Sequence, residues 1–186
     1  FDDDQGFNSG AAYFFGLDAQ AWVQKQKLTA ADGSINDQFG WVVALHGDTA
    51  VVGARFDDNK GINSGSAYVY TRHEHKWRLQ QHLIASDGEL GNQYSWAIAL
   101  GSDTLIIGAP FNSIKRPLSG SCYVYQRNGD SWSEKQKLTA GVELLAERYG
   151  TSIALEGNTL LIGACLDSPR APLSSSPWAG ATCVPF

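Results

Sequence analysis

The sequence repeats itself at a fixed spacing of 55 residues. The segment Gly-Ser-Ala-Tyr-Val-Tyr at residues 65–70 recurs with small changes one spacing earlier and one spacing later. Trp22, Trp77 and Trp132 keep the same spacing. A chain built this way is expected to fold as an array of similar structural units, each packed on its neighbour. The units align without a gap over residues 1–55, 56–110 and 111–165.

Each unit is predicted to contain four short antiparallel strands. In the middle of the chain these strands are expected at residues 39–45, 49–55, 65–72 and 77–85, and we call them A, B, C and D. Small residues such as Gly47-Asp48 separate A from B, which suits a tight hairpin turn. No segment carries a convincing apolar period of 3.6 residues, so little helix is expected. The fold class is therefore all-β, with four-stranded blades of a β-propeller.

The register of the repeats predicts an incomplete propeller. The chain is expected to contain half a blade, two full blades and a further half blade, whereas propellers close with about four to eight blades. We therefore expect a fragment of a longer protein, or copies that associate. A β-solenoid or an open sandwich is the alternative architecture. Residues 166–186 form an irregular tail rich in proline and serine, and both a linker and a shifted reading frame fit it.

Two short motifs in the repeats resemble those of a known family. Phe39-Gly40 followed by Gly53-Ala54, together with residues 27–33 and 64–70, resembles the FG-GAP repeat of integrin α-chain propellers. The resemblance covers residues 1–165 and implies a propeller in extracellular or cell-surface proteins that bind partners. The second and third units depart from the Phe-Gly pattern, and the proline kept at one position is replaced in the other two units. Tyr94-Ser95 and Tyr149-Gly150 stand where Phe-Gly is expected. The proline of the Gly-Ala-Pro motif is present as Pro110 and is replaced by Arg55 and Cys165 in the other units.

The calcium loop of integrin-type repeats is not expected in this chain. In that family the loop joins the Phe-Gly strand to the Gly-Ala-Pro strand. Here the same connection is only His46-Gly47-Asp48 or its equivalent. So short a turn cannot supply the six to eight oxygen ligands that Ca²⁺ takes. No cofactor is predicted to be required, and Ca²⁺ binding elsewhere stays a hypothesis.

Composition and motifs exclude several classes of function. The net charge is −5, and no run of Lys and Arg exceeds two residues, so nucleic acid is not an expected partner. No apolar run reaches the roughly 18–20 residues of a transmembrane helix. The sequence lacks a nucleophile elbow, a P-loop, a dinucleotide fingerprint and a Cys-x-x-Cys pair, so the chain is predicted not to be an enzyme.

The long loops are predicted to form the ligand face. Antiparallel strands alternate in direction, so the B–C and D–A loops share one rim and the short turns share the other. Loops held by a rigid scaffold commonly carry function. Candidate ligand-binding residues on this rim are Asp57, Asp58, Asn59, Asp87 and Asn112, and candidate metal ligands are Asp2, Asp3 and Asp4. For all of them, as for Asp32, the alternative is a solvated turn in which the side chain caps its own backbone.

The remaining conspicuous side chains are interpreted as structural. Trp22, Trp77 and Trp132 are expected to pack between blades rather than to form a sugar platform, because they recur. Cys122 is expected to be a small buried residue. Trp41 and Trp96 are expected in the core, and His73-Glu74-His75 is interpreted as a solvated turn rather than a metal site.

The predicted function is a non-enzymatic binding or adhesion module of an extracellular FG-GAP propeller. Its partners would be a protein or glycan ligand, and further blades of the same protein or a second copy of the chain. Two alternatives stay open. The chain could be a segment of a propeller enzyme whose catalytic residues lie in blades not present here, or a structural fragment without a ligand of its own.

Overall fold

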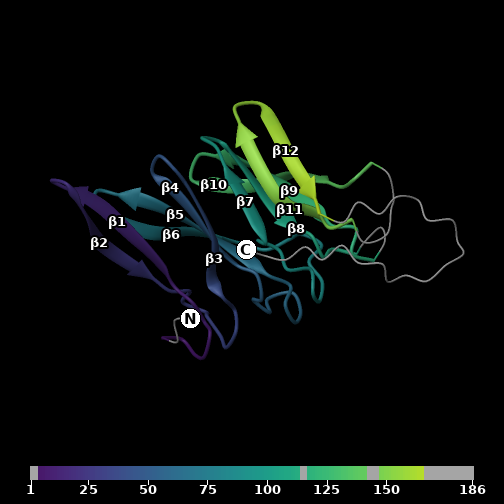
Figure 1. Ribbon diagram of the computed structural model, residues 1–186, viewed down its shortest axis with the longest axis horizontal. Coiled ribbons are helices and arrows are strands. Elements are labelled where there is room, and N and C mark those ends of the chain that lie inside the picture. The colour runs from purple at the N-terminus through teal and green to yellow at the C-terminus, as the bar shows by residue number, and fades with distance from the viewer. Residues whose placement is uncertain (1–3, 114–116, 142–146, 166–186) are drawn as a thin grey trace, which may run out of the picture.

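The computed structural model describes residues 4–113, 117–141 and 147–165, and the elements in these ranges are all β-strands (Figure 1). The tail 166–186 lies outside the described residues. The twelve strands are β1 (Ala12–Asp18), β2 (Ala21–Leu28), β3 (Phe39–His46), β4 (Thr49–Ala54), β5 (Ser66–His73), β6 (Lys76–Leu83), β7 (Ala97–Leu100), β8 (Thr104–Ala109), β9 (Ser121–Asn128), β10 (Ser131–Leu138), β11 (Tyr149–Glu156) and β12 (Thr159–Ala164).

The strands form two full blades flanked by two hairpins. The full blades are antiparallel sheets in the simple orders β3-β4-β5-β6 and β7-β8-β9-β10, and the hairpins are β1-β2 and β11-β12. Tight turns join β3 to β4 and β5 to β6, and Gly47 takes the left-handed conformation (φ 56°) that such a turn requires. The predicted all-β fold with antiparallel four-stranded blades is confirmed.

The four sheets stand side by side in chain order (Figure 1). The first strand of each successive blade lies next to the first strand of the following one, so β3, β7 and β11 are neighbours. Short parallel bridges, Gly10 with Phe39 and Gly120 with Tyr149, join consecutive sheets. Within the described residues the sheets form an open arc and do not close into a ring.

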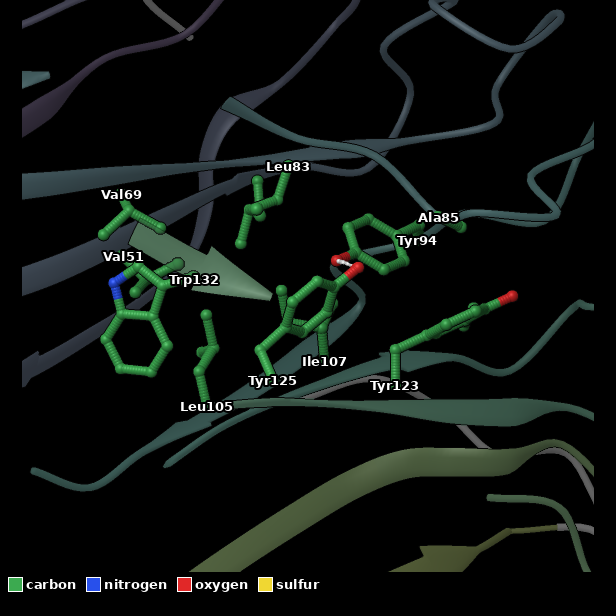
Figure 2. Close-up of a cluster of buried hydrophobic side chains, with 12 residues drawn as sticks. Val51, Val69, Leu83, Ala85, Tyr94, Leu105, Ile107, Tyr123, Tyr125 and Trp132 are labelled. Carbon is green, nitrogen blue, oxygen red and sulfur yellow. Dashed lines mark hydrogen bonds between the residues drawn. The ribbon is translucent and has the colours of Figure 1, made fainter. Parts of the chain in front are cut away.

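The hydrophobic core lies between the blades. Figure 2 shows the cluster between the two full blades, where Tyr94, Tyr125 and Trp132 face Val69 and other small apolar side chains. The Tyr94 hydroxyl donates a hydrogen bond to the Tyr125 hydroxyl at 2.8 Å, which satisfies a polar group inside this core. A second cluster repeats the arrangement between the β1-β2 hairpin and the first full blade. The first full blade is therefore covered on both faces, which explains why all six residues of its strand β4 are buried.

The tryptophan predictions are only partly correct. Trp77 and Trp132 are buried between blades as expected, and Trp77 stacks on Phe14 with ring centroids 4.3 Å apart. Trp22 is 70% exposed, because no described sheet covers its side of the first hairpin. Trp41 and Trp96 are predicted to lie in the core, but Trp41 is 39% exposed and Trp96 is only half-buried.

The other structural interpretations agree with the coordinates. Cys122 is completely buried, and the turn containing His73, Glu74 and His75 is exposed. Strand β7 begins at Ala97, three residues later than the 55-residue spacing from Phe39 predicts.

Candidate functional site

The long loops gather on one rim of the arc, as predicted. They join β2 to β3, β4 to β5, β6 to β7 and β8 to β9, and they lie along the lower side of the sheets in Figure 1. The short hairpin turns lie on the opposite rim. The antiparallel meander dictates this division, because every second connection returns to the same end of the sheet.

Backbone hydrogen bonds tie the long loops to one another. Gly91 N donates to Ile62 O at 2.8 Å, and Tyr94 N donates to Ser64 O at 2.8 Å. Each bond joins a B–C loop to the D–A loop that leads into the next blade. The rim is therefore a connected set of loops rather than a set of independent ones. Equivalent bonds recur in the neighbouring units: Asn36 N to Phe7 O, Phe39 N to Ser9 O and Tyr149 N to Ser119 O.

Apolar side chains project from the joined loops at repeated positions. Ile62 is 61% exposed and Leu90 is 69% exposed, although both lie on loops that hydrogen bonds hold in place. Phe7 and Ile35 occupy the equivalent positions one unit earlier and are exposed to a similar degree. The loop rim thus presents large apolar groups to solvent on an ordered backbone.

Asp57 organises the loop between β4 and β5. It is only 3% exposed, and its Oδ2 accepts hydrogen bonds from Ser66 Oγ and from the Tyr68 hydroxyl, both at 2.9 Å. Its Oδ1 accepts from Asn59 N at 2.9 Å, as in an Asx turn. Asp58 Oδ1 accepts from Asn63 N at 2.7 Å. The predicted residues Asp57, Asp58 and Asn59 therefore all shape this loop.

The other predicted ligand residues meet in the next blade. Asp87 Oδ2 accepts from Lys137 Nζ at 2.6 Å, and its Oδ1 accepts from the Tyr123 hydroxyl at 2.5 Å. Asn112 is buried, and its Oδ1 accepts from Lys137 Nζ at 3.2 Å. Burial by itself raises the pKa of Asp87, but the bonds from Lys137 and Tyr123 outweigh it and leave the pKa lowered.

The acidic N-terminal run is only partly described. Asp4 forms an ion pair with Lys27 at 2.5 Å. Asp2 and Asp3 lie outside the described residues.

Two further residues complete a cluster around Asp57: Asp32, which is interpreted from the sequence as a turn residue, and His82, for which the sequence analysis makes no prediction. The Tyr68 hydroxyl lies 2.9 Å from Asp32 Oδ1 as well as from Asp57 Oδ2 and can donate to only one of them, and Asp32 Oδ2 lies 3.6 Å from His82 Nδ1. Ligand atoms of Asp32, Asp57 and His82 all lie within 4.8 Å of one another. The 55-residue alignment contains the signal for this cluster, because it pairs Asp32 with Asp87 and His82 with Lys137.

Burial perturbs two further titratable groups near the rim. Burial raises the pKa of Asp37 to about 6; the hydrogen bond from Ser34 N opposes this shift, and the charges of Asp57, Asp58 and Asp32 add to it. Burial lowers the pKa of Arg55 to about 10.

Aromatic rings surround the Arg55 guanidinium, whose carbon lies 3.3 Å from the centre of a Trp41 ring. The rings of Phe56 and Trp96 lie 4.3 and 4.7 Å from the same atom. Arg55 stands where Pro110 stands in the next unit, so this cation–π cluster is peculiar to one repeat.

The short turns do not fit the calcium loop of integrin-type repeats. Asp48 accepts from Arg72 Nε at 2.7 Å, and Asp103 lies 3.9 Å from Arg127 Nε. Each aspartate thus forms an ion pair with an arginine on the third strand of its blade, and the turns are too short to surround a calcium ion.

A model of the FG-GAP repeat matches the chain at three positions, residues 22–70, 77–125 and 132–177. The chain belongs to the FG-GAP repeat family. The first two matches begin at the outermost strand of one sheet and end at the third strand of the next, so the sequence repeat spans two sheets. The third match begins on β10 and ends at residue 177, outside the described residues. A search of curated proteins found no match. Among the described residues, no helix is long and apolar enough to cross a membrane.

Proposed function

We propose that this FG-GAP chain is a non-enzymatic binding or adhesion module whose ligand face is the loop rim. The observation that carries the proposal is that the loops of this rim are held in place and yet expose large apolar side chains. Backbone hydrogen bonds hold the loops together, and Ile62 and Leu90 nevertheless project into solvent. Preordered loops lose little entropy when a partner binds, and exposed apolar groups provide area to bury.

The ligand class that suits this face is a protein or a glycan, at the cell surface or outside the cell. Large apolar groups at loop tips make contacts with protein side chains or with the apolar faces of sugar rings. The acidic groups that line the rim, such as Asp58, would disfavour a phosphate backbone. The FG-GAP family membership supports a surface role by analogy.

The ends of the arc are proposed to bind further blades or a second copy of the chain. Tyr13, Phe15 and Trp22 are exposed on the first hairpin, whereas their equivalents Tyr68, Tyr70 and Trp77 are buried against a neighbouring sheet. Leu161 is exposed on the last hairpin, while the equivalent Ile106 is buried. The side chains that pack between blades in the middle of the chain are therefore exposed at its two ends, where another blade could cover them.

The rim can be tested with the double variant Ile62→Ser/Leu90→Ser. The purified chain would be screened on a glycan array and on a panel of purified extracellular proteins. We expect at least one ligand whose binding weakens about tenfold or more in the double variant, because apolar area buried on binding is lost.

The matched control is Leu79→Ser, which removes an exposed leucine from β6 outside the loop rim. This variant should keep the affinity of the unmodified chain. A ligand bound equally well by all three proteins would place the binding face elsewhere, and the absence of any ligand would remove the proposal.

A further inference from the structure

A pocket of constant design recurs between the loop rim and the outer strand of each full blade. Four side chains form it: an aspartate from the preceding D–A loop, an aspartate or asparagine from the B–C loop, a tyrosine from the third strand and a basic residue from the fourth. The first full blade supplies Asp32, Asp57, Tyr68 and His82, and the second supplies Asp87, Asn112, Tyr123 and Lys137.

In the second blade the pocket is filled by its own cation. Lys137 Nζ lies 2.6 Å from Asp87 Oδ2 and 3.2 Å from Asn112 Oδ1, so the ammonium sits between both loop residues. The Tyr123 hydroxyl donates to Asp87 and accepts from Asn112 Nδ2 at 3.2 Å. The Asp87 carboxylate faces the Lys137 ammonium, and the Tyr123 hydroxyl has one acceptor for its one proton. This pocket is balanced in both charge and hydrogen bonds.

In the first blade the same pocket is unbalanced. Asn112 is replaced by Asp57 and Lys137 by His82, which adds a carboxylate and removes the permanent cation. The Tyr68 hydroxyl lies 2.9 Å from an oxygen of Asp32 and 2.9 Å from an oxygen of Asp57. Its one proton can serve only one of these two acceptors. A positive group is therefore missing at the position where Lys137 Nζ stands in the sister pocket.

The imidazole of His82 does not supply that group by a direct bond. Its Nδ1 lies 3.6 Å from Asp32 Oδ2, which is too long for a hydrogen bond. Among the described residues its Nε2 has no hydrogen-bond partner, although this atom is buried. The ring stacks on Tyr68 with centroids 4.3 Å apart, so its orientation is held by packing.

We propose that Asp32, Asp57 and His82 bind a divalent transition-metal ion of the Zn²⁺ class, which takes the place of the Lys137 ammonium. Two carboxylates and one imidazole form a borderline ligand set that suits Zn²⁺ better than Ca²⁺ or Mg²⁺. Bonds of about 2.0–2.2 Å to one ion bring ligand atoms to about 3–4 Å from one another, and the three groups already lie within 4.8 Å. The Asp32 side chain is about half exposed, so water can complete the coordination.

The site would join two loops and a strand. Asp32 lies on the loop between β2 and β3, Asp57 on the loop between β4 and β5, and His82 on β6. A bound ion would therefore cross-link the first hairpin to the first full blade beside the loop rim. This inference is independent of the proposed function, because it rests on charge and geometry in one pocket.

The experiment is a titration of the chelator-treated full chain with ZnCl₂, monitored by isothermal titration calorimetry. A second titration, with CoCl₂, is monitored by absorption in the visible region. We expect one ion per chain in this pocket and a Co²⁺ spectrum in the visible region. His82→Lys copies the sister pocket and should weaken binding at least 100-fold, while the metal-free protein keeps or raises its melting temperature. Asp57→Asn should also weaken binding.

Two further variants separate this site from alternatives. His73→Ala/His75→Ala removes the exposed histidine pair on the opposite rim and should leave the affinity unchanged. Asn112→Asp/Lys137→His converts the sister pocket into a copy of the proposed site and should add a second bound ion.

Several results would overturn the proposal. These are the absence of binding at millimolar Zn²⁺, an affinity unaffected by His82→Lys in a folded variant, loss of the ion in His73→Ala/His75→Ala, or a stoichiometry that stays at one in a folded Asn112→Asp/Lys137→His variant. If Zn²⁺ does not bind while His82→Lys raises the melting temperature, the pocket lacks a positive charge but is not a metal site.

Discussion

Ser95 illustrates how a single residue departs from the repeat without breaking the fold. The equivalent positions hold Gly40 and Gly150, whose φ values are 91° and 93°, and a Cβ built on Gly40 would lie 2.3 Å from Ala11 O. Ser95 takes the same left-handed conformation with φ 70°, and its buried hydroxyl has no hydrogen-bond partner among the described residues. The Phe-Gly motif is thus a backbone requirement, which one unit meets with a strained serine.

At the same scale, Asp37 makes stability depend on pH. Its pKa is raised to about 6 in the folded chain, against an ordinary value of 3.8, so the folded state binds the proton more tightly than the unfolded state. The resulting stabilisation is complete below about pH 4 and is lost as the pH rises through 6. Asp37→Asn keeps an acceptor for Ser34 N and removes the charge.

We therefore compare the free energy of unfolding of Asp37→Asn with that of the unmodified chain at pH 4 and at pH 7.5. The difference in favour of Asp37→Asn should be up to about 2 kcal/mol larger at pH 7.5 than at pH 4. Urea unfolding at both pH values, with a chelator present, measures this difference. A gain that is equal at the two pH values would show that Asp37 is not the titrating group.

At the scale of elements, a glutamine clamps the outer strands of neighbouring sheets. Gln81 Nε2 donates to Trp132 O at 2.9 Å, and Gln81 Oε1 accepts from Trp132 N at 2.7 Å. Gln26 makes the same two bonds with Trp77 one unit earlier, at 2.9 and 2.8 Å. The side-chain amide imitates one step of a β-ladder and so holds the edge of one blade against the next.

Gln81→Ala should lower the free energy of unfolding by about 1–3 kcal/mol, because it leaves a partly buried N–H and C=O without partners. The adjacent Gln80→Ala is the control, since no group described in the structure donates to Gln80 Oε1. Chemical denaturation of both variants measures the effect. Equal losses would mean that the clamp contributes nothing beyond strand propensity.

At the scale of the whole molecule, stability is a property of neighbouring blades rather than of single ones. The core clusters lie between sheets, and the same positions recur in both of them at the repeat spacing. A blade face therefore becomes part of a core only where another blade covers it. Trp22 and Trp77 are equivalent in sequence and differ only in this respect.

This difference predicts that the same substitution has different effects at the two positions. Trp22→Ser should leave the melting temperature nearly unchanged and reduce self-association of the chain, because it removes exposed apolar surface. Trp77→Ser should destabilise the fold by about 3–5 kcal/mol through loss of a buried ring. Sedimentation velocity and thermal melting distinguish the two effects. Unchanged association in Trp22→Ser would argue against docking on the first hairpin.

The strands, their antiparallel order and the rim that carries the long loops could all be predicted from the repeat pattern. These follow from local turns and from a repeat that keeps one pattern at 55-residue spacing, so each unit supports the reading of the next. The sequence also placed Asp57, Asp87 and Asn112 on that rim.

Which distant residues meet, and which faces are covered, depends on how the sheets pack against one another and could not be predicted from the repeat pattern. Asp32, Asp57 and His82 come from two loops and a strand, and their proximity depends on how two sheets pack rather than on spacing along the chain. The exposure of Trp22 and Trp41 depends in the same way on what lies beside them. Periodicity encodes the repeated unit, whereas burial and clusters of side chains arise from the contacts that each unit makes with its own neighbours.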